Sequence, residues 1–139
     1  MGARREVFVI VAFCDIEGIV PEAVPLLFDL VRRSKPGFVH YLPPGSLIAY
    51  SRAKRRGVAR ARSLVEAFRA LQSNDPRLRG CGVGSAIGEG IADFHWHGRM
   101  KSEALGDITI HAMRRAEASS RERRGLPVGR IREMWSGTI

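Results

Sequence analysis

One uninterrupted apolar segment constrains the fold of this 139-residue chain more than any other feature. Residues 7–14 read V-F-V-I-V-A-F-C, a run rich in β-branched side chains and without a polar position. Because the run is short for a helix and shows no alternation, it predicts a β-strand that is covered on both faces. We therefore expect it to be the central strand of the domain.

The spacing of apolar residues and the turn residues between them predict the other elements. In chain order the predicted elements are strand 7–14, helix 21–33, strands 38–42 and 47–50, helix 53–71, strands 81–89, 91–96 and 100–105, and helix 108–124. This order, βαββαβββα, alternates too closely for a β-sandwich. It favours an α+β, ferredoxin-like sheet with helices mainly on one face.

Size and composition indicate a single domain over residues 1–139, with a polar tail at residues 125–139. No apolar run approaches the roughly 20 residues that a membrane helix needs, so we expect no membrane partner. Cys14 and Cys81 lie in apolar segments and make neither a disulfide framework nor a metal knuckle. Together with the absence of a recognisable leader sequence, the short apolar runs and the two isolated cysteines predict a cytoplasmic protein.

The positive charge is concentrated in one part of the chain. The net charge is +9, and residues 52–79 hold nine basic against two acidic side chains. Within the helix predicted there, Arg55, Arg62 and Arg69 recur every seven residues, and Arg52 extends this basic patch. The patch is interpreted either as a solvated helix face or as a surface for nucleic acid, and the solvated face is favoured. Strand 82–89 has no Phe or Tyr, so the stacking ribbon of an RNA-recognition motif is missing.

Four motifs, in order, resemble the class III nucleotidyl (adenylate and guanylate) cyclase homology domain. Residues 13–20, F-C-D-I-E-G-I-V, resemble its F-x-D-I-x-G-F-T opening. Residues 82–90 resemble its R-x-G-I-H-T-G-E-V strand, and residues 105–114 its G-D-x-V-N-x-A-A-R helix start. The hairpin at residues 42–50 falls where the family has I-G-D-x-x-x-A-x-F. The resemblance, over roughly residues 6–124, implies the family's nucleotide-cyclase-type sheet and a homodimer with its active site between subunits.

The resemblance also implies roles for individual residues. Asp15 matches the first of two aspartates that hold Mg²⁺ or Mn²⁺ in the family. The second aspartate aligns with Pro44 or Ser46, neither of which is a carboxylate. Arg114 matches the transition-state arginine, but the accompanying asparagine position holds Ile110, which cannot donate a hydrogen bond.

The same alignment gives candidate nucleotide-binding residues, which are His40, Glu103 and Arg114. His40, or Leu42 in the other register, occupies the position of the purine-selecting lysine, and Glu103 that of its partner. A purine nucleotide is therefore a candidate ligand.

The incomplete catalytic set predicts a degenerate cyclase-like domain, catalytically inactive, that serves as a binding or dimerisation module in signalling or regulation. Two alternatives stay open. One is a nucleic-acid-binding ferredoxin-like module that uses the basic helix 52–71. The other is an active purine nucleotidyl cyclase, in which Glu17 or a partner subunit would have to replace the missing metal ligand.

Two further patterns do not belong to this set. Asp93, His95 and His97 alternate along a predicted strand and are interpreted either as metal ligands or, preferably, as exposed polar positions. The glycine-rich residues 80–90 match neither a dinucleotide-binding fingerprint nor a P-loop. They predict a strand with bulges, or a close backbone approach at a subunit interface.

Overall fold

The computed structural model describes residues 5–16, 21–42, 45–94, 100–103, 105–123 and 125. Its elements are β1 (Arg5–Cys14), the 3₁₀ turn η2 (Pro21–Ala23), α1 (Val24–Arg33), β2 (Phe38–Leu42), β3 (Ser46–Arg52), α2 (Arg55–Asn74), the 3₁₀ turn η3 (Pro76–Leu78), β4 (Gly82–Phe94), β5 (Met100–Glu103) and α3 (Leu105–Arg123). Among these helices, none combines the length and the apolar composition that crossing a membrane requires.

The strands form one antiparallel sheet in the order β2-β3-β1-β4-β5. The apolar run is its centre, because β1 pairs with β3 on one side and with β4 on the other. Val9, for example, lies opposite Ser51 of β3 and Ile87 of β4. The predicted α+β class and the central position of this strand are thus confirmed.

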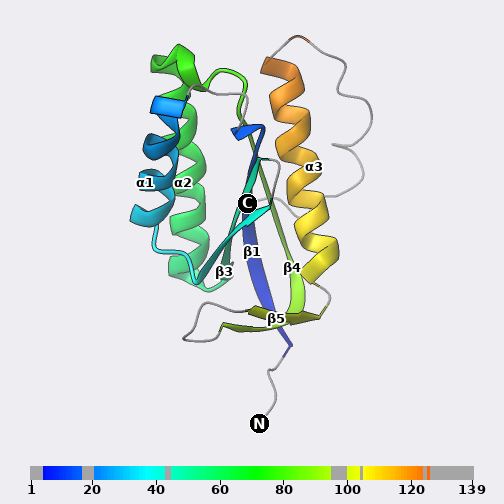
Figure 1. Ribbon diagram of the computed structural model, residues 1–139. Coiled ribbons are helices and arrows are strands. Elements are labelled where there is room, and N and C mark those ends of the chain that lie inside the picture. The colour runs from blue at the N-terminus through cyan, green and yellow to red at the C-terminus, as the bar shows by residue number, and fades with distance from the viewer. Residues whose placement is uncertain are drawn as a thin grey trace.

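Helices cover both faces of the sheet (Figure 1). Alternate residues of β1 point to opposite sides, so Val9, Val11 and Phe13 pack in the cluster that includes Leu27 of α1 and Phe68 of α2. The other β1 side chains, Phe8, Ile10 and Ala12, pack with α3 through Ile108, Ala112 and Ala116. The prediction of helices mainly on one face therefore holds for α1 and α2, whereas α3 covers the opposite face. An apolar strand without a polar side requires such cover on both faces.

The strands expected over residues 81–89 and 91–96 are one continuous strand, β4. Gly90 is buried and lies opposite Glu6 of β1, and the ladder continues through Ile91 opposite Arg5. From Ile91 to Phe94, β4 also pairs with β5. Because the ladder is not interrupted at Gly90, the observed order is βαββαββα.

The glycines at the start of β4 allow α3 to pack closely on the sheet. A Cβ atom at Gly82 would overlap the carbonyl of Ala116 and lie 2.6 Å from the nitrogen of Ser120. At Gly84 it would overlap the nitrogen of Ala116 and lie 2.5 Å from the carbonyl oxygen of Ala112. The close backbone approach expected of this stretch is therefore to α3 of the same chain.

Candidate functional site

Asp15 ends the central strand in an unusual backbone conformation. Its φ angle is +60°, in the left-handed region that aspartate enters more readily than most residues. The next residue, Ile16, is buried and donates a backbone hydrogen bond to the carbonyl of Gly45, with an N–O distance of 3.0 Å. The Asp15 side chain is half-buried, and its Oδ2 atom is shielded from solvent. The end of β1 is thereby fixed beside the turn that joins β2 to β3.

The adjacent turn brings no second carboxylate to this place. Ser46 begins β3, and the ladder sets Leu47 opposite Phe13, two residues before Asp15. Hard divalent cations prefer several oxygen ligands, carboxylates above all, so a hydroxyl at this position makes a poorer partner for Asp15. Within the described residues, no three or more His, Cys, Asp and Glu side chains converge as a metal site. Glu17, Pro44, His95 and His97 lie outside those residues.

Arg114 and Ile110 lie one turn apart on the outer side of α3. Both are exposed, and 46% of the surface of Ile110 is accessible. The opposite side of the helix carries Ala112 and Ala116, which are fully buried against the sheet. Glu117, three residues after Arg114, approaches Arg121, with an Oε1–Nε distance of 3.7 Å. Arg114 therefore points away from the sheet that carries Asp15, and one chain does not bring the two side chains together.

His40 belongs to an aromatic row on the α3 side of the sheet. Its ring stacks on that of Phe38, with centroids 6.3 Å apart and planes inclined by 20°. Phe38 in turn lies 6.1 Å from the ring of Tyr50, whose hydroxyl accepts a 3.4 Å hydrogen bond from Thr109 of α3. Burial raises the pKa of Tyr50 above its ordinary value, so the phenol stays neutral. His40 itself is exposed.

Glu103 lies in a different part of the sheet. It ends β5, at the edge opposite to β2, which carries His40. Its partner in the ladder is Ile91, which lies opposite Arg5 at the start of β1. Glu103 and Asp15 are therefore placed toward opposite ends of the central strand.

The basic patch divides into two parts. Arg55, Arg62 and Arg69 are exposed on α2, on the side away from its buried apolar residues, and no ion pair of theirs is found in the part of the chain that the structure describes. Arg52 belongs to β3 instead, and its Nε donates to Oε2 of Glu6 over 3.1 Å. Within the described residues, the helical part of the patch is thus without ion pairs, whereas Arg52 is paired with Glu6.

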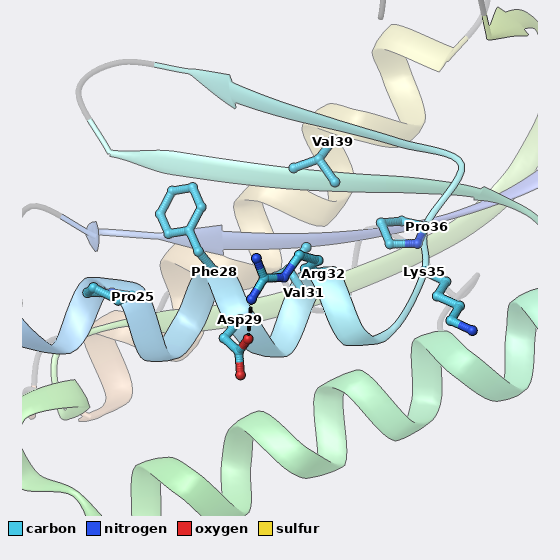
Figure 2. A pocket seen from close by; sticks show the side chains of 8 residues that line it. All are labelled: Pro25, Phe28, Asp29, Val31, Arg32, Lys35, Pro36 and Val39. Atoms are coloured by element: carbon cyan, nitrogen blue, oxygen red, sulfur yellow. Dashed lines mark hydrogen bonds and ion pairs between the residues drawn. The ribbon is translucent and has the colours of Figure 1, made fainter. Parts of the chain in front are cut away.

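Two grooves that sequence reasoning missed flank α1. One, of about 580 Å³, lies between α1 and β2 and is shown in Figure 2, where Phe28 rises from the helix toward the strand that carries Val39. The other, of about 370 Å³, lies between α1 and α2. Asp15, His40 and Arg114 line neither groove. The first groove lies between consecutive elements, whereas the second arises from packing between α1 and α2, which are distant in sequence, so no local pattern could have indicated it.

No model of a known protein family matches the sequence, and no curated protein sequence matches it either. Solved structures do match its fold. The guanylyl cyclase Cya2 superposes with a TM-score of 0.55 at 16% identity, over 88% of this chain and 80% of that one. The monomeric guanylyl cyclase domain of the RhoGC fusion protein, from the aquatic fungus Blastocladiella emersonii, gives 0.60 at 10% identity, over 90% and 89%.

A third match is the catalytic core of a rhodopsin-guanylyl cyclase with converted specificity, in complex with ATPαS. It gives a TM-score of 0.57 at 10% identity, over 87% of this chain and 83% of that one. Because these sequence identities are low, the matches show a similarity of fold alone. The chain therefore has the fold of a class III nucleotidyl cyclase-like domain.

Proposed function

We propose that this chain is a cyclase-like domain that no longer makes cyclic nucleotides and serves as a binding or dimerisation module in signalling or regulation. The observation that carries the proposal is the end of β1. Asp15 stands there beside the β2–β3 turn, and the described part of that turn, Gly45 and Ser46, offers it no second carboxylate. A two-metal reaction needs ligands for both ions, and this arrangement lacks those of one.

The outer side of α3 supports the same conclusion. In the family that the sequence resembles, an asparagine four residues before the arginine stabilises the transition state. Here that position is Ile110, an exposed aliphatic side chain with no donor. Removing one oriented donor of this kind costs on the order of 100- to 1,000-fold in rate. Together with the incomplete metal site, this loss favours a role in binding over catalysis.

A purine nucleotide is the ligand that we favour for the module. Arg114 retains a guanidinium that can pair with phosphate in a bidentate way. The exposed ring of His40, stacked on Phe38, offers a flat surface for a base. A related fold, the rhodopsin-guanylyl cyclase core, binds ATPαS. Because Arg114 points away from its own sheet, a site that also uses Asp15 requires a second subunit, which is why we propose a homodimer.

An assay of cyclic nucleotide formation tests the loss of catalysis. Purified protein with ATP or GTP and Mg²⁺ or Mn²⁺ should form no detectable cyclic AMP or cyclic GMP. Asp29→Ala, which removes an exposed carboxylate from α1, is the matched control for Asp15→Ala. Turnover that survives Asp29→Ala but disappears in Asp15→Ala would refute the proposal.

Calorimetric titration tests nucleotide binding separately. ATP and GTP with Mg²⁺ should release or absorb heat with the wild type, and Arg114→Ala should weaken the binding. Arg121→Ala, on the same helix, removes a guanidinium that approaches Glu117 and should have no such effect. The absence of heat with the wild type would exclude a retained nucleotide site.

A further inference from the structure

The groove between α1 and α2 has two positively charged walls. Arg33 and Ser34 line it from the end of α1, and Arg60 and Ser63 line it from α2. Leu30 and Leu64 contribute apolar surface, and no acidic residue takes part in the lining. Its volume of about 370 Å³ is within the range of ligand pockets, roughly 300–1,000 Å³. The groove is separate from Asp15 at the end of β1 and from Arg114 on the far face of the sheet.

The charges around this groove are not balanced. Asp29 is shared by two guanidiniums, with an Oδ1–Nη2 distance of 2.6 Å to Arg32 and an Oδ2–Nη2 distance of 2.5 Å to Arg33. Hydrogen bonds from these arginines hold the pKa of Asp29 below its ordinary value, so it stays ionised. Asp29 and Arg32 line the neighbouring groove between α1 and β2, and of this trio only Arg33 lines the groove between α1 and α2.

Arg60 has no such compensation. Its neighbours three and four positions along α2 are Arg56, Gly57, Ser63 and Leu64, none of which is acidic. Arg60 forms no ion pair with any other residue that the structure describes. Of the two guanidiniums that line the groove, that of Arg33 is paired with Asp29, whereas that of Arg60 is uncompensated and would be stabilised by an anion.

We propose that this groove binds a phosphate ester, with Arg33 and Arg60 as its charged ligands. A guanidinium presents paired N–H donors that match two phosphate oxygens, and Arg60 offers such a group from α2. Arg33, which also donates to Asp29 through Nη2, adds positive charge from α1. The hydroxyl of Ser63 supplies a further donor. The hydroxyl of Ser34 already donates to the carbonyl oxygen of Val31 over 2.6 Å, so Ser34 lines the groove without donating to the phosphate. The apolar surface of Leu30 and Leu64 accommodates the organic part of the ester.

The first experiment uses glycerol 3-phosphate, a probe without a base that the cyclase-type site could recognise. Saturable binding is expected by NMR titration, with amide shifts in residues 30–34 and 59–64, and not with chloride at equal ionic strength. Arg60→Gln should weaken binding at least about fivefold, because a charge-assisted hydrogen bond is lost. Arg69→Gln, an equally exposed change on the same helix, should leave it within about twofold. Arg114→Ala should leave it unchanged.

A second arm identifies the source of the phosphate. A single-stranded DNA 12-mer that displaces glycerol 3-phosphate, and that Arg60→Gln weakens more than Arg69→Gln, would place a nucleic-acid phosphate in the groove. Displacement by small phosphate esters but not by the oligonucleotide would assign a free ester. The proposal fails if glycerol 3-phosphate does not bind saturably, or if Arg60→Gln and Arg69→Gln weaken binding equally. Melting temperatures within about 2 °C of the wild type show that these surface variants are folded.

Discussion

The backbone N–H of Ile16 donates to the carbonyl of Gly45 over 3.0 Å, and this hydrogen bond joins the end of β1 to the β2–β3 turn. Asp15 precedes one partner and Ser46 follows the other. The hydrogen bond therefore holds the residue after Asp15 against the residue before Ser46. We therefore expect a carboxylate introduced at residue 46 to lie near Asp15.

Replacing Ser46 by Asp should create a stronger cation site than the wild type has. Two carboxylates supply more oxygen ligands than one, and we expect Mn²⁺ affinity to rise at least about tenfold. Titration calorimetry measures the change. Ser73→Asp adds the same charge on the exposed side of α2 and is the control. Equal Mn²⁺ affinities of the two variants, or a gain at Ser46 that survives Asp15→Ala, would contradict the proposed geometry.

Replacing Gly84 by Ala should destabilise the domain markedly. The new Cβ would overlap the nitrogen of Ala116, and because this atom belongs to the α3 backbone, relief requires a shift of the helix. Overpacking of this kind costs about 1–3 kcal/mol. Urea unfolding measures the loss. Gly125→Ala, at φ +72° but with no atom within 4 Å, isolates the cost of backbone strain alone and should lose only about 1 kcal/mol.

Local sequence patterns predicted the part of the fold and the site that depends on β1. The apolar run gave the central strand and its cover on both faces, and the charged residues after Phe13 placed Asp15 at its end. The P-P-G-S turn likewise predicted the hairpin beside it. These features depend on neighbours in the sequence, which is why periodicity and turn residues were sufficient to find them.

The rest depends on contacts between distant residues. α3 reaches the sheet largely through Ala112 and Ala116, and these small side chains give a weak apolar signal. The two alanines can approach the sheet because Gly82 and Gly84, some 30 residues earlier in the chain, have no side chains. Apolar periodicity within one segment does not connect residues so far apart in the sequence. The same limitation applies to Gly90. Whether a glycine ends a strand depends on the partner strand, here β1.

Charge reversal on the outer side of α2 tests the solvated-face interpretation. Replacing Arg55, Arg62 and Arg69 by Glu should change the free energy of unfolding by no more than about 1 kcal/mol, since all three are exposed and pack against nothing in the core. Thermal and urea unfolding measure the effect. Salt-sensitive retention of duplex DNA or RNA by the wild type, abolished in the triple variant, would instead assign this face to nucleic acid.

Ile110 provides a test of the proposed homodimer. It is 46% exposed on α3, so Ile110→Arg should leave the folded chain within about 0.5 kcal/mol of wild-type stability. If its side of α3 faces a second subunit, a charge there should shift the association equilibrium toward monomer in sedimentation experiments. Leu26→Arg, at a 36% exposed apolar residue of α1, is the control and should leave association unchanged. A wild type that sediments as a monomer at high micromolar concentration would remove the dimer from the proposal.

Cys81 should make stability depend on pH at the alkaline end. It is fully buried, and burial, with a smaller contribution from Cys14, raises its pKa from 9.0 to about 12. The folded state therefore keeps a proton that the unfolded state releases above pH 9, so its contribution is complete below pH 9 and is lost as pH rises toward 12. Over this interval the free energy of unfolding of the wild type should fall more steeply than that of Cys81→Ala, by up to about 1.4 kcal/mol per pH unit. Urea unfolding between pH 8 and 11 measures both slopes. Parallel curves would show that the thiol ionises as readily in the folded chain as in the unfolded one.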